Sequence, residues 1–265
     1  MNDHEVARAV ALAAGAAILQ TQQEIVATLK GDIDEPSRTA LGIAGDRRGQ
    51  EVSAELLQQL RPSDAVLSEE GFHDSARHGV DRLWIIDPLD GTANYSRGGE
   101  EFAVHVALWV RGSDAPSEIT AACVFVPHTQ ELLSMDDVRP EQPGTEAEVQ
   151  PAIRLLVSRS RKPKELDVLV EGMAKRLSRN IETISMSSVG AKVAAIIRGD
   201  ADLYVNTGGF HEWDLAAPLG IAHHYGLSVC DRNGATISFN QSETQVPNAV
   251  ISRPQFVAAV IDSLA

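Results

Sequence analysis

The stretch RLWIIDPLDGTANY, residues 82–95, constrains the fold more than any other part of the chain. Its apolar run, Leu83 to Ile86, stops directly at Asp87, and Asp90 follows shortly after. We expect the run to be a buried strand. Two unpaired carboxylates at the end of such a strand are strongly disfavoured, because each loses hydration and repels the other. They must share a proton, pair with basic side chains or bind a cation.

The turn between the two aspartates is rigid and rich in oxygen ligands. Pro88 fixes φ and removes one N–H donor, and the carbonyl of Leu89 can face the same point as the carboxylates. Hard oxygen ligands at a rigid corner suit Mg²⁺, which takes a near-octahedral oxygen shell. Gly91 and Thr92 follow at an expected helix start, where backbone N–H groups can bind a phosphate. The turn therefore predicts a metal and phosphate site.

Further acids stand at the ends of expected elements. Glu69 and Glu70 follow the expected strand AVLS, Asp46 precedes an expected helix, and Asp214 lies near the start of another. Taken alone, each has an ordinary explanation: a solvated loop pair, an N-cap, or an acid favoured by the helix dipole. The first motif, taken alone, could likewise be a helix cap followed by a plain turn. Together, these acids are what a multi-metal site needs.

Segments with strand and helix patterns are interleaved along the chain, and several strands are expected to pair as hairpins. Helices are expected over 6–29, 46–60, 163–177, 189–199 and 213–226 and from Pro254, with a loop over 30–46. Strands are expected over 65–68, 83–87, 101–110, 153–160, 201–206 and 249–252, with hairpins over 118–135 and 228–239. One buried face is expected from the alternating residues Phe102, Val104, Val106, Leu108 and Val110. This pattern favours an α/β fold of mixed sheets layered with helices over a purely parallel sheet.

Length and charge limit the classes of partner. The 265 residues fit one domain of two packed lobes, about 1–135 and 150–265, with the acidic, Pro-rich segment 136–151 as the boundary. A net charge of −14 repels nucleic acid polymers and anionic membranes. We find neither a long apolar run nor a secretory signal pattern, so a cytoplasmic protein is expected. Cys123 and Cys230 are expected to be buried free thiols.

The motif DPLDGTANY, with SEEG upstream and EWDLAA downstream, resembles the inositol monophosphatase family of Mg²⁺-dependent, lithium-sensitive phosphatases. All three elements occur in the family's order, and the resemblance covers nearly the whole chain. It implies a layered α/β/α/β/α sandwich and two or three Mg²⁺ ions in each active site. Family members are often dimers, so a homodimer is an implied possibility.

The resemblance also implies roles for single residues. Glu69, Asp87 and the carbonyl of Leu89 would hold one metal, and Asp87, Asp90 and Asp214 a second. Asp46 and Thr92 would orient the attacking water, with Glu69 as a third catalytic residue. Substrate contacts are implied for Leu89, Asp90, Gly91, Thr92, Ser158, Lys192 and Asp214.

Features in the second half favour one branch of the family. The segment LLVSRSRKP resembles the branch that dephosphorylates 3′-phosphoadenosine 5′-phosphate, with Arg161 where histidine is usual, and SSVGAKVAAI places Lys192 near a lysine that this branch uses for its nucleotide. Arg159 and Arg161 form a basic patch fit for a second phosphate, whereas Lys162 and Lys164 are expected to be solvated. The expected products are AMP and phosphate.

Alternatives remain open. Inositol 1-phosphate and fructose 1,6-bisphosphate are the other substrates considered. A non-catalytic metal or nucleotide sensor is the alternative from another class, although a sensor needs no pair such as Asp46 and Thr92 to orient water. Haloacid-dehalogenase-type phosphatases share some motif letters, but Pro88 stands where their nucleophilic aspartate would be. The histidines His211, His223 and His224 suggest zinc only weakly, because no HExxH pattern is present.

Overall fold

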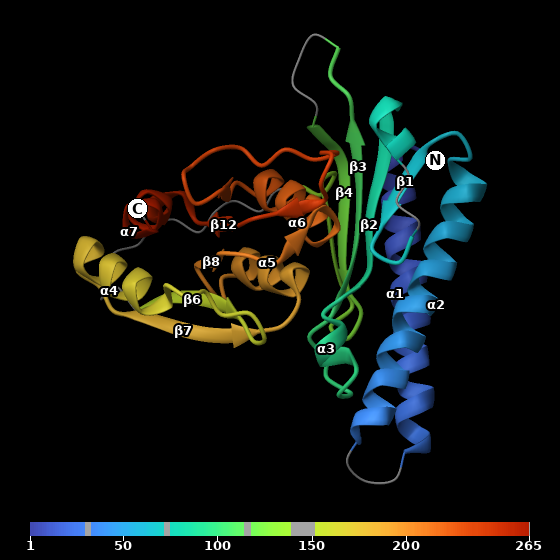
Figure 1. The fold of residues 1–265 in the computed structure, drawn as a ribbon, viewed down its shortest axis with the longest axis horizontal. Helices are drawn as coiled ribbons and strands as arrows, with labels where there is room; N and C mark the ends of the chain where they lie inside the picture. The colour runs from blue at the N-terminus through green and yellow to red at the C-terminus, as the bar shows by residue number, and fades with distance from the viewer. Residues whose placement is uncertain (30–32, 72–74, 114–117, 139–151, 265) are drawn as a thin grey trace.

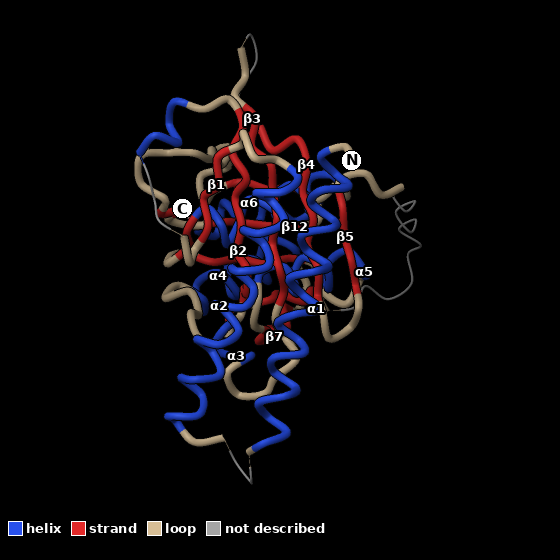
Figure 2. The backbone as a smooth tube through the Cα atoms, turned by 90° about the vertical axis from the view of Figure 1, so that its right-hand side faces the viewer, coloured by secondary structure: helices blue, strands red, loops and turns tan. Residues whose placement is uncertain are grey.

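The computed structural model describes residues 1–29, 33–71, 75–113, 118–138 and 152–264. It is built of five layers, in the order helix pair, sheet, helix pair, sheet, helix pair (Figure 1). The long helices α1 (Asp3–Thr28) and α2 (Glu35–Leu60) form one outer layer. The view of Figure 2 shows both lying across the outer face of the first sheet. The predicted layered sandwich of mixed sheets is confirmed.

The first sheet has the strand order β1-β2-β3-β4-β5, with β1 and β2 parallel and the remaining neighbours antiparallel. Its strands are β1 (Ala65–Ser68), β2 (Arg82–Asp90), β3 (Ala103–Val110), β4 (Glu118–Val126) and β5 (Glu131–Ser134). The predicted hairpin of β4 and β5 is confirmed. The short helices η1 (Ser75–Gly79) and α3 (Thr92–Tyr95) stand at either end of β2.

The second sheet has the order β10-β12-β8-β6-β7 and is also mixed. Its strands are β6 (Ile153–Ser158), β7 (Ile181–Met186), β8 (Leu203–Asn206), β10 (Ser228–Cys230) and β12 (Ala249–Ser252); β9 (Phe210–His211) and β11 (Gln245–Val246) pair separately. The helices of this half are α4 (Leu166–Leu177), α5 (Val189–Arg198), α6 (Glu212–His224), η2 (Pro254–Phe256) and α7 (Val257–Leu264). Helices α5 and α6 lie between the two sheets, and α4 and α7 form the last layer (Figure 1).

Strand β3 is buried on both faces. As predicted, Phe102, Val104, Val106 and Leu108 face one side, where they pack in a cluster with residues of α1 and α2. The opposite face carries Ala103, Ala107 and Trp109, which pack in the central cluster with residues of α5 and α6. A sheet covered by helices on both faces explains why the strand before Asp87 is so apolar.

The prediction of a loop over 30–46 was wrong, because α2 begins at Glu35. Asp34 caps this helix by accepting a hydrogen bond from Ser37 N, and a proline stands in its first turn. Glycines made the segment look like a loop, but they serve packing. A Cβ at Gly45 would lie 2.5 Å from the Tyr95 ring, and one at Gly49 would lie 2.9 Å from Pro88 O. Because these glycines have no side chain, α2 can approach the Asp-Pro turn closely.

Two further predictions in the second half need correction. Residues 228–239 do not form a hairpin: β10 pairs instead with β12, and residues 235–239, after the turn at Asn233-Gly234, are not a strand. In addition, β7 was not expected, because its residues Ile181–Met186 show little apolar alternation; it is an edge strand that pairs in parallel with β6.

Three other expectations concern the boundary between lobes, the cysteines and membrane-spanning helices. The predicted boundary segment, 136–151, lies mostly outside the described residues, and the division into two lobes stays a prediction. Cys123 and Cys230 are free and buried, as expected. None of the helices in the described ranges has both the length and the apolar character that crossing a bilayer requires.

Candidate metal and phosphate site

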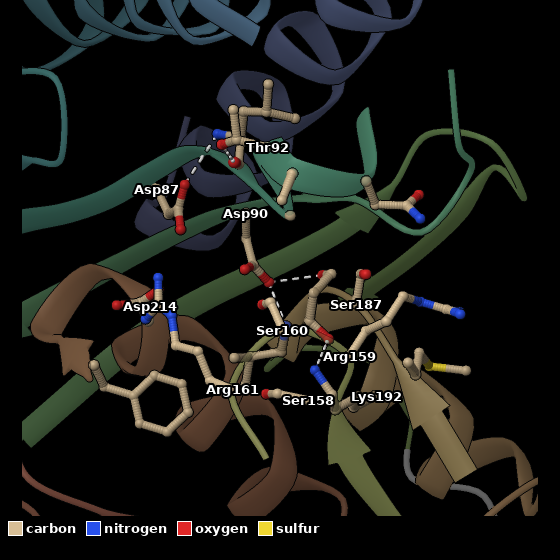
Figure 3. A pocket seen from close by; sticks show the side chains of 18 of the residues that line it. Asp87, Asp90, Thr92, Ser158, Arg159, Ser160, Arg161, Ser187, Lys192 and Asp214 are labelled. Carbon is tan, nitrogen blue, oxygen red and sulfur yellow. Dashed lines mark hydrogen bonds between the residues drawn. The ribbon is translucent and has the colours of Figure 1, made fainter. Parts of the chain in front are cut away.

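The end of β2 opens into a pocket of about 370 Å³, which is lined by residues of the first sheet, of α2 and of the ends of second-sheet strands. Every site residue predicted from the sequence lies in its wall: Asp46, Glu69, Asp87, Leu89, Asp90, Gly91, Thr92, Ser158, Lys192 and Asp214. These residues come from parts of the chain far apart in sequence. Figure 3 shows Asp87 and Thr92 on one side of Asp90, and Lys192 and Ser158 on the other.

The turn after the apolar strand is shaped by its own backbone. Pairing with β3 shifts register between Asp87 and Asp90, so the chain bulges where the two carboxylates stand. Leu89 N donates to Asp87 Oδ1 at 3.0 Å, which leaves Oδ2 available to another partner. Gly91 has φ of 99°, and a Cβ there would lie 2.7 Å from Glu101 O. Only glycine fits this position.

Thr92 and Asp46 meet beside this turn. Asp46 lies in the middle of α2, so the interpretation of Asp46 as an N-cap was wrong. The Thr92 hydroxyl lies 3.1 Å from Asp46 Oδ1 and 3.0 Å from Leu89 O. It has one proton and can donate to only one of these acceptors at a time. Donation to Asp46 leaves the Leu89 carbonyl free to bind another group.

Three carboxylates converge on one point. Asp87, Asp90 and Asp214 each offer an oxygen, and these oxygens lie within 4.8 Å of one another. Asp214 reaches the cluster from the first turn of α6, where its Oδ2 accepts from His211 N at 2.6 Å. Within the described ranges, this is the one cluster of three acidic, histidine or cysteine side chains with such spacing.

Crowding and burial shift the pKa values of these acids. Burial and then the charge of Asp90 raise the pKa of Asp214 to about 6. Burial, followed by the charges of Glu69 and Asp90, raises the pKa of Asp87 well above its usual range. The pKa of Glu69 is raised to about 7, first by burial and then by the charge of Asp214. Its side chain keeps contact with solvent, which screens part of that repulsion.

Asp90 differs from its neighbours, because its pKa is lowered to about 2. Burial alone would raise this pKa, but His105 and Lys192 favour the carboxylate. His105 Nε2 lies 3.2 Å from Asp90 Oδ2. Ser188 Oγ, Val189 N and Gly190 N also donate to Oδ2. Asp90 therefore stays ionised.

The cluster fits a divalent cation that prefers oxygen. All of its donors are carboxylates, with the carbonyl of Leu89 lining the same pocket. A bound cation would offset the repulsion that raises the pKa values of Asp87 and Asp214. Among the described residues, the cluster consists of aspartates alone: the His211 side chain contacts Thr244 and stacks on Trp213, and His224 contacts Asp137 O. Oxygen ligands without nitrogen or sulfur suit Mg²⁺ better than zinc.

The opposite wall is cationic. Lys192 is 1% exposed; its Nζ donates to Ser188 O at 2.9 Å and lies 4.7 Å from the centre of the Tyr204 ring. Burial lowers the pKa of Lys192 to about 8. Ser158 Oγ lies 2.9 Å from the Tyr204 hydroxyl. The wall therefore offers positive charge and hydroxyl groups to a bound anion.

Two arginines complete this wall in different ways. Arg159 forms an ion pair with Glu101 at 2.7 Å, so much of its charge is already neutralised. Arg161 donates to Gly209 O, its one hydrogen bond to the described part of the chain, and lies close enough to Asp214 to lower the pKa of that carboxyl. Lys162 and Lys164 are exposed and do not line the pocket, as expected.

Several lining residues carry no signal in the sequence. Met186 and Phe210 add apolar surface, and Ser188 contacts Asp90. His105 lies under the cluster, 0% exposed, on strand β3. A histidine inside an alternating apolar strand gives no hint of what its side chain contacts, because that depends on how the two sheets pack together.

The comparisons with known proteins agree with this site. A model described as the inositol monophosphatase family matches residues 2–263. The chain is 36% identical over 253 residues to the “3'-phosphoadenosine 5'-phosphate phosphatase” of Mycobacterium tuberculosis, covering 95% of this chain and 89% of that protein. It is also 36% identical over 258 residues to the protein of that name from Mycobacterium leprae, covering 96% and 90%.

Solved structures show the same fold. CysQ from Bacteroides thetaiotaomicron, described as a bacterial member of the inositol monophosphatase family, superposes with a TM-score of 0.74 at 25% identity, covering 95% of this chain and 97% of that one. An inositol monophosphatase from Zymomonas mobilis gives a TM-score of 0.75 at 18% identity, covering 99% and 97%. The family match spans nearly the whole chain, so the chain belongs to the inositol monophosphatase family and is a phosphatase.

Proposed function

We propose that the protein hydrolyses 3′-phosphoadenosine 5′-phosphate to AMP and phosphate, with Mg²⁺ as its cofactor. One observation carries the proposal: a single pocket has a carboxylate cluster with the Thr92–Asp46 pair on one wall, and Lys192 with two arginines on the other. A bisphosphate has one phosphate for each wall. The names of the two mycobacterial relatives support the choice of nucleotide.

The acidic wall would hold the cofactor. Glu69, Asp87 and the carbonyl of Leu89 form one candidate ligand set, and Asp87, Asp90 and Asp214 form a second. When bound, Mg²⁺ supplies positive charge that makes water more acidic and stabilises the departing oxygen. The number of ions, two or three, follows from the family resemblance alone.

Thr92 and Asp46 would orient the attacking water. Burial, followed by the charge of Glu70, raises the pKa of Asp46 to about 6, so its carboxylate is ionised at pH 7 and basic enough to take a proton. The water oxygen forms a bond to phosphorus as the bond from phosphorus to the 3′ oxygen breaks. The departing oxygen takes up a proton, so that AMP and phosphate are released. No covalent bond to the protein is required.

The cationic wall would bind the second phosphate. Arg161 is the stronger candidate of the two arginines, because Glu101 already pairs with Arg159. A guanidinium matches phosphate geometry with two parallel hydrogen bonds. Lys192 is buried in the same wall, and within the described residues its Nζ donates one hydrogen bond, to the Ser188 carbonyl, so it retains donors for a ligand.

Phosphate release from the nucleotide tests the proposal directly. The purified protein is incubated with 3′-phosphoadenosine 5′-phosphate, once with Mg²⁺ and once with excess chelator. We expect phosphate to be released in the sample with Mg²⁺ and not in the sample with chelator. Absence of release in both samples would refute the proposal. If Mg²⁺ binding is then detected by calorimetry without turnover of any ester, the protein is a metal sensor.

A further inference from the structure

Ser188 has an unusual backbone and lies between the two walls of the pocket. It precedes α5 as its N-cap, with φ of 59° and ψ of 131°. Residues other than glycine rarely adopt a positive φ, because the Cβ makes this backbone conformation unfavourable. The residue is 5% exposed. A strained, buried serine persists only where its surroundings fix it in place.

Three contacts that involve side chains fix Ser188. Its Oγ donates to Asp90 Oδ2 at 2.6 Å and accepts from Ala191 N at 3.1 Å. Its backbone carbonyl accepts from Lys192 Nζ at 2.9 Å. One residue therefore contacts a carboxylate of the acidic wall and the ammonium of the cationic wall. Figure 3 shows Asp90 and Lys192, the two ends of this connection, each with a dashed line that marks a hydrogen bond.

The contact to Asp90 determines which of its oxygens can face the cluster. Besides Ser188 Oγ, the backbone N–H groups of Val189 and Gly190 donate to Oδ2, the latter at 3.2 Å. A carboxylate oxygen accepts about two hydrogen bonds through its lone pairs, so Oδ2 is fully used. Asp90 can offer only Oδ1 to the point where the carboxylates converge.

The contact to Lys192 fixes the ammonium in a similar way. Burial leaves this group few partners, and the Ser188 carbonyl satisfies one of its three N–H groups. The Tyr204 ring lies on another side, 4.7 Å from Nζ, and adds cation–π attraction. The ammonium is therefore held at a set distance from Asp90.

We propose that Ser188 is a positioning residue, which ties Asp90 and Lys192 together so that the metal-binding and anion-binding walls keep a fixed relation. This role of Ser188 rests on the proposed function, because that function assigns the metal to one wall and the second phosphate to the other. Ser188 itself touches neither the cofactor nor the reacting phosphate in this account. It acts through Asp90 by its hydroxyl and through Lys192 by its carbonyl.

Two substitutions distinguish the effect of losing the Ser188 hydroxyl from the effect of relieving the backbone strain. Ser188→Ala removes the hydroxyl and keeps the Cβ, whereas Ser188→Gly removes both. We expect both variants to lose about 10-fold to 100-fold in kcat/KM, the range for one hydrogen bond to a charged group. We also expect half-saturating Mg²⁺ to rise several-fold in both. The glycine variant should unfold at higher urea concentration than the alanine variant, because it relieves the strain.

This pattern distinguishes positioning from plain stabilisation. If Ser188 only stabilised the fold, the more stable glycine variant would recover wild-type kcat/KM and Mg²⁺ dependence, and that result would overturn the proposal. Ser252→Ala is the matched control, since Ser252 is a fully buried serine whose Oγ donates to the Arg253 carbonyl at 2.8 Å, away from the pocket. It should lose stability without a change in half-saturating Mg²⁺.

A second measurement needs no activity. The metal-free single variants Ser188→Ala and Asp90→Ala and their double variant are unfolded in urea. We expect the two changes to be non-additive, with a coupling of about 5-fold or more in the unfolding equilibrium constant. Additive effects would overturn the contact on which the proposal rests. Coupling without phosphatase activity in the wild type would instead show that the proposed function fails while the connection holds.

Discussion

The Thr92 hydroxyl lies 3.1 Å from Asp46 Oδ1, although the two residues are 46 positions apart in the chain. Asp46 reaches Thr92 from the middle of α2, and it can do so because Gly45 and Gly49 let that helix approach the turn at Pro88. The same hydroxyl lies 3.0 Å from Leu89 O. A group shared between a carboxylate and a candidate metal ligand is well placed to hold a water molecule.

Asp46→Asn should therefore impair the chemical step more than metal binding. The amide preserves shape but cannot accept a proton. We expect kcat to fall by about 100-fold or more, within the usual range for loss of a general base. Half-saturating Mg²⁺ should change little. Steady-state kinetics over a Mg²⁺ series measures both values, with Glu51→Gln, an exposed acid on the same helix, as control. Wild-type kcat in Asp46→Asn would contradict this role.

The metal-free protein should become less stable as pH rises. Asp46 and Asp214 have pKa values raised to about 6, so the folded state binds their protons more tightly than the unfolded state does. Their contribution is complete below about pH 4 and is lost as pH rises through 6. For the buried Asp214 alone we expect a loss on the order of 2 kcal/mol between pH 4.5 and 7.5, measured by urea unfolding in chelator. The half-buried Asp46 should add less, because solvent screens its charge.

Added Mg²⁺ should reverse that trend, because the cation binds the ionised carboxylates and thus the folded state. Asp87→Asn is the matched variant, since it removes one charge from the cluster. Its metal-free stability should depend less on pH than that of the wild type. A metal-free wild-type protein that gains stability over this pH range would rule out the account of the cluster.

Gly91→Ala should destabilise the protein and abolish activity. The backbone has φ of 99°, and the new Cβ would lie 2.7 Å from Glu101 O. Strain and overlap together should cost about 2 kcal/mol or more, seen as a lower urea midpoint. Gly79→Ala is the control, because a Cβ there meets nothing within 4 Å. Equal effects of the two substitutions would show that the turn is not as tight as described.

Arg161→Gln should alter specificity. We expect KM for 3′-phosphoadenosine 5′-phosphate to rise by about 10-fold to 100-fold, since a charged contact to the second phosphate is lost. KM for inositol 1-phosphate should stay unchanged, because that substrate has a single phosphate. Lys164→Gln, at an exposed position outside the pocket, should affect neither. A rise in KM for both substrates would assign Arg161 to the shared phosphate instead.

Much of this site could be predicted because its chemistry is local in sequence. The turn at 87–92 carries two carboxylates, together with a proline and a glycine, and these last two residue types indicate a tight turn from the sequence alone. The α2 helix could not be predicted from the same kind of reasoning. Its glycines break helices on average, and only the contact of Gly45 with Tyr95 and Leu89 explains them.

Contacts between elements that are far apart in the chain could not be predicted from the sequence either. Ser188 and His105 contact Asp90 only because α5 and β3 pack against the end of β2. The missed strand β7 has a similar cause, since it pairs with β6 along an exposed edge that needs no apolar alternation.

We propose that the pocket hydrolyses a bisphosphate nucleotide with Mg²⁺. The most direct test compares kcat/KM for 3′-phosphoadenosine 5′-phosphate, inositol 1-phosphate and fructose 1,6-bisphosphate under identical Mg²⁺ concentrations. We predict the highest value for the nucleotide, by about 10-fold or more, because it presents one phosphate to each wall. A higher value for inositol 1-phosphate or fructose 1,6-bisphosphate would contradict the account.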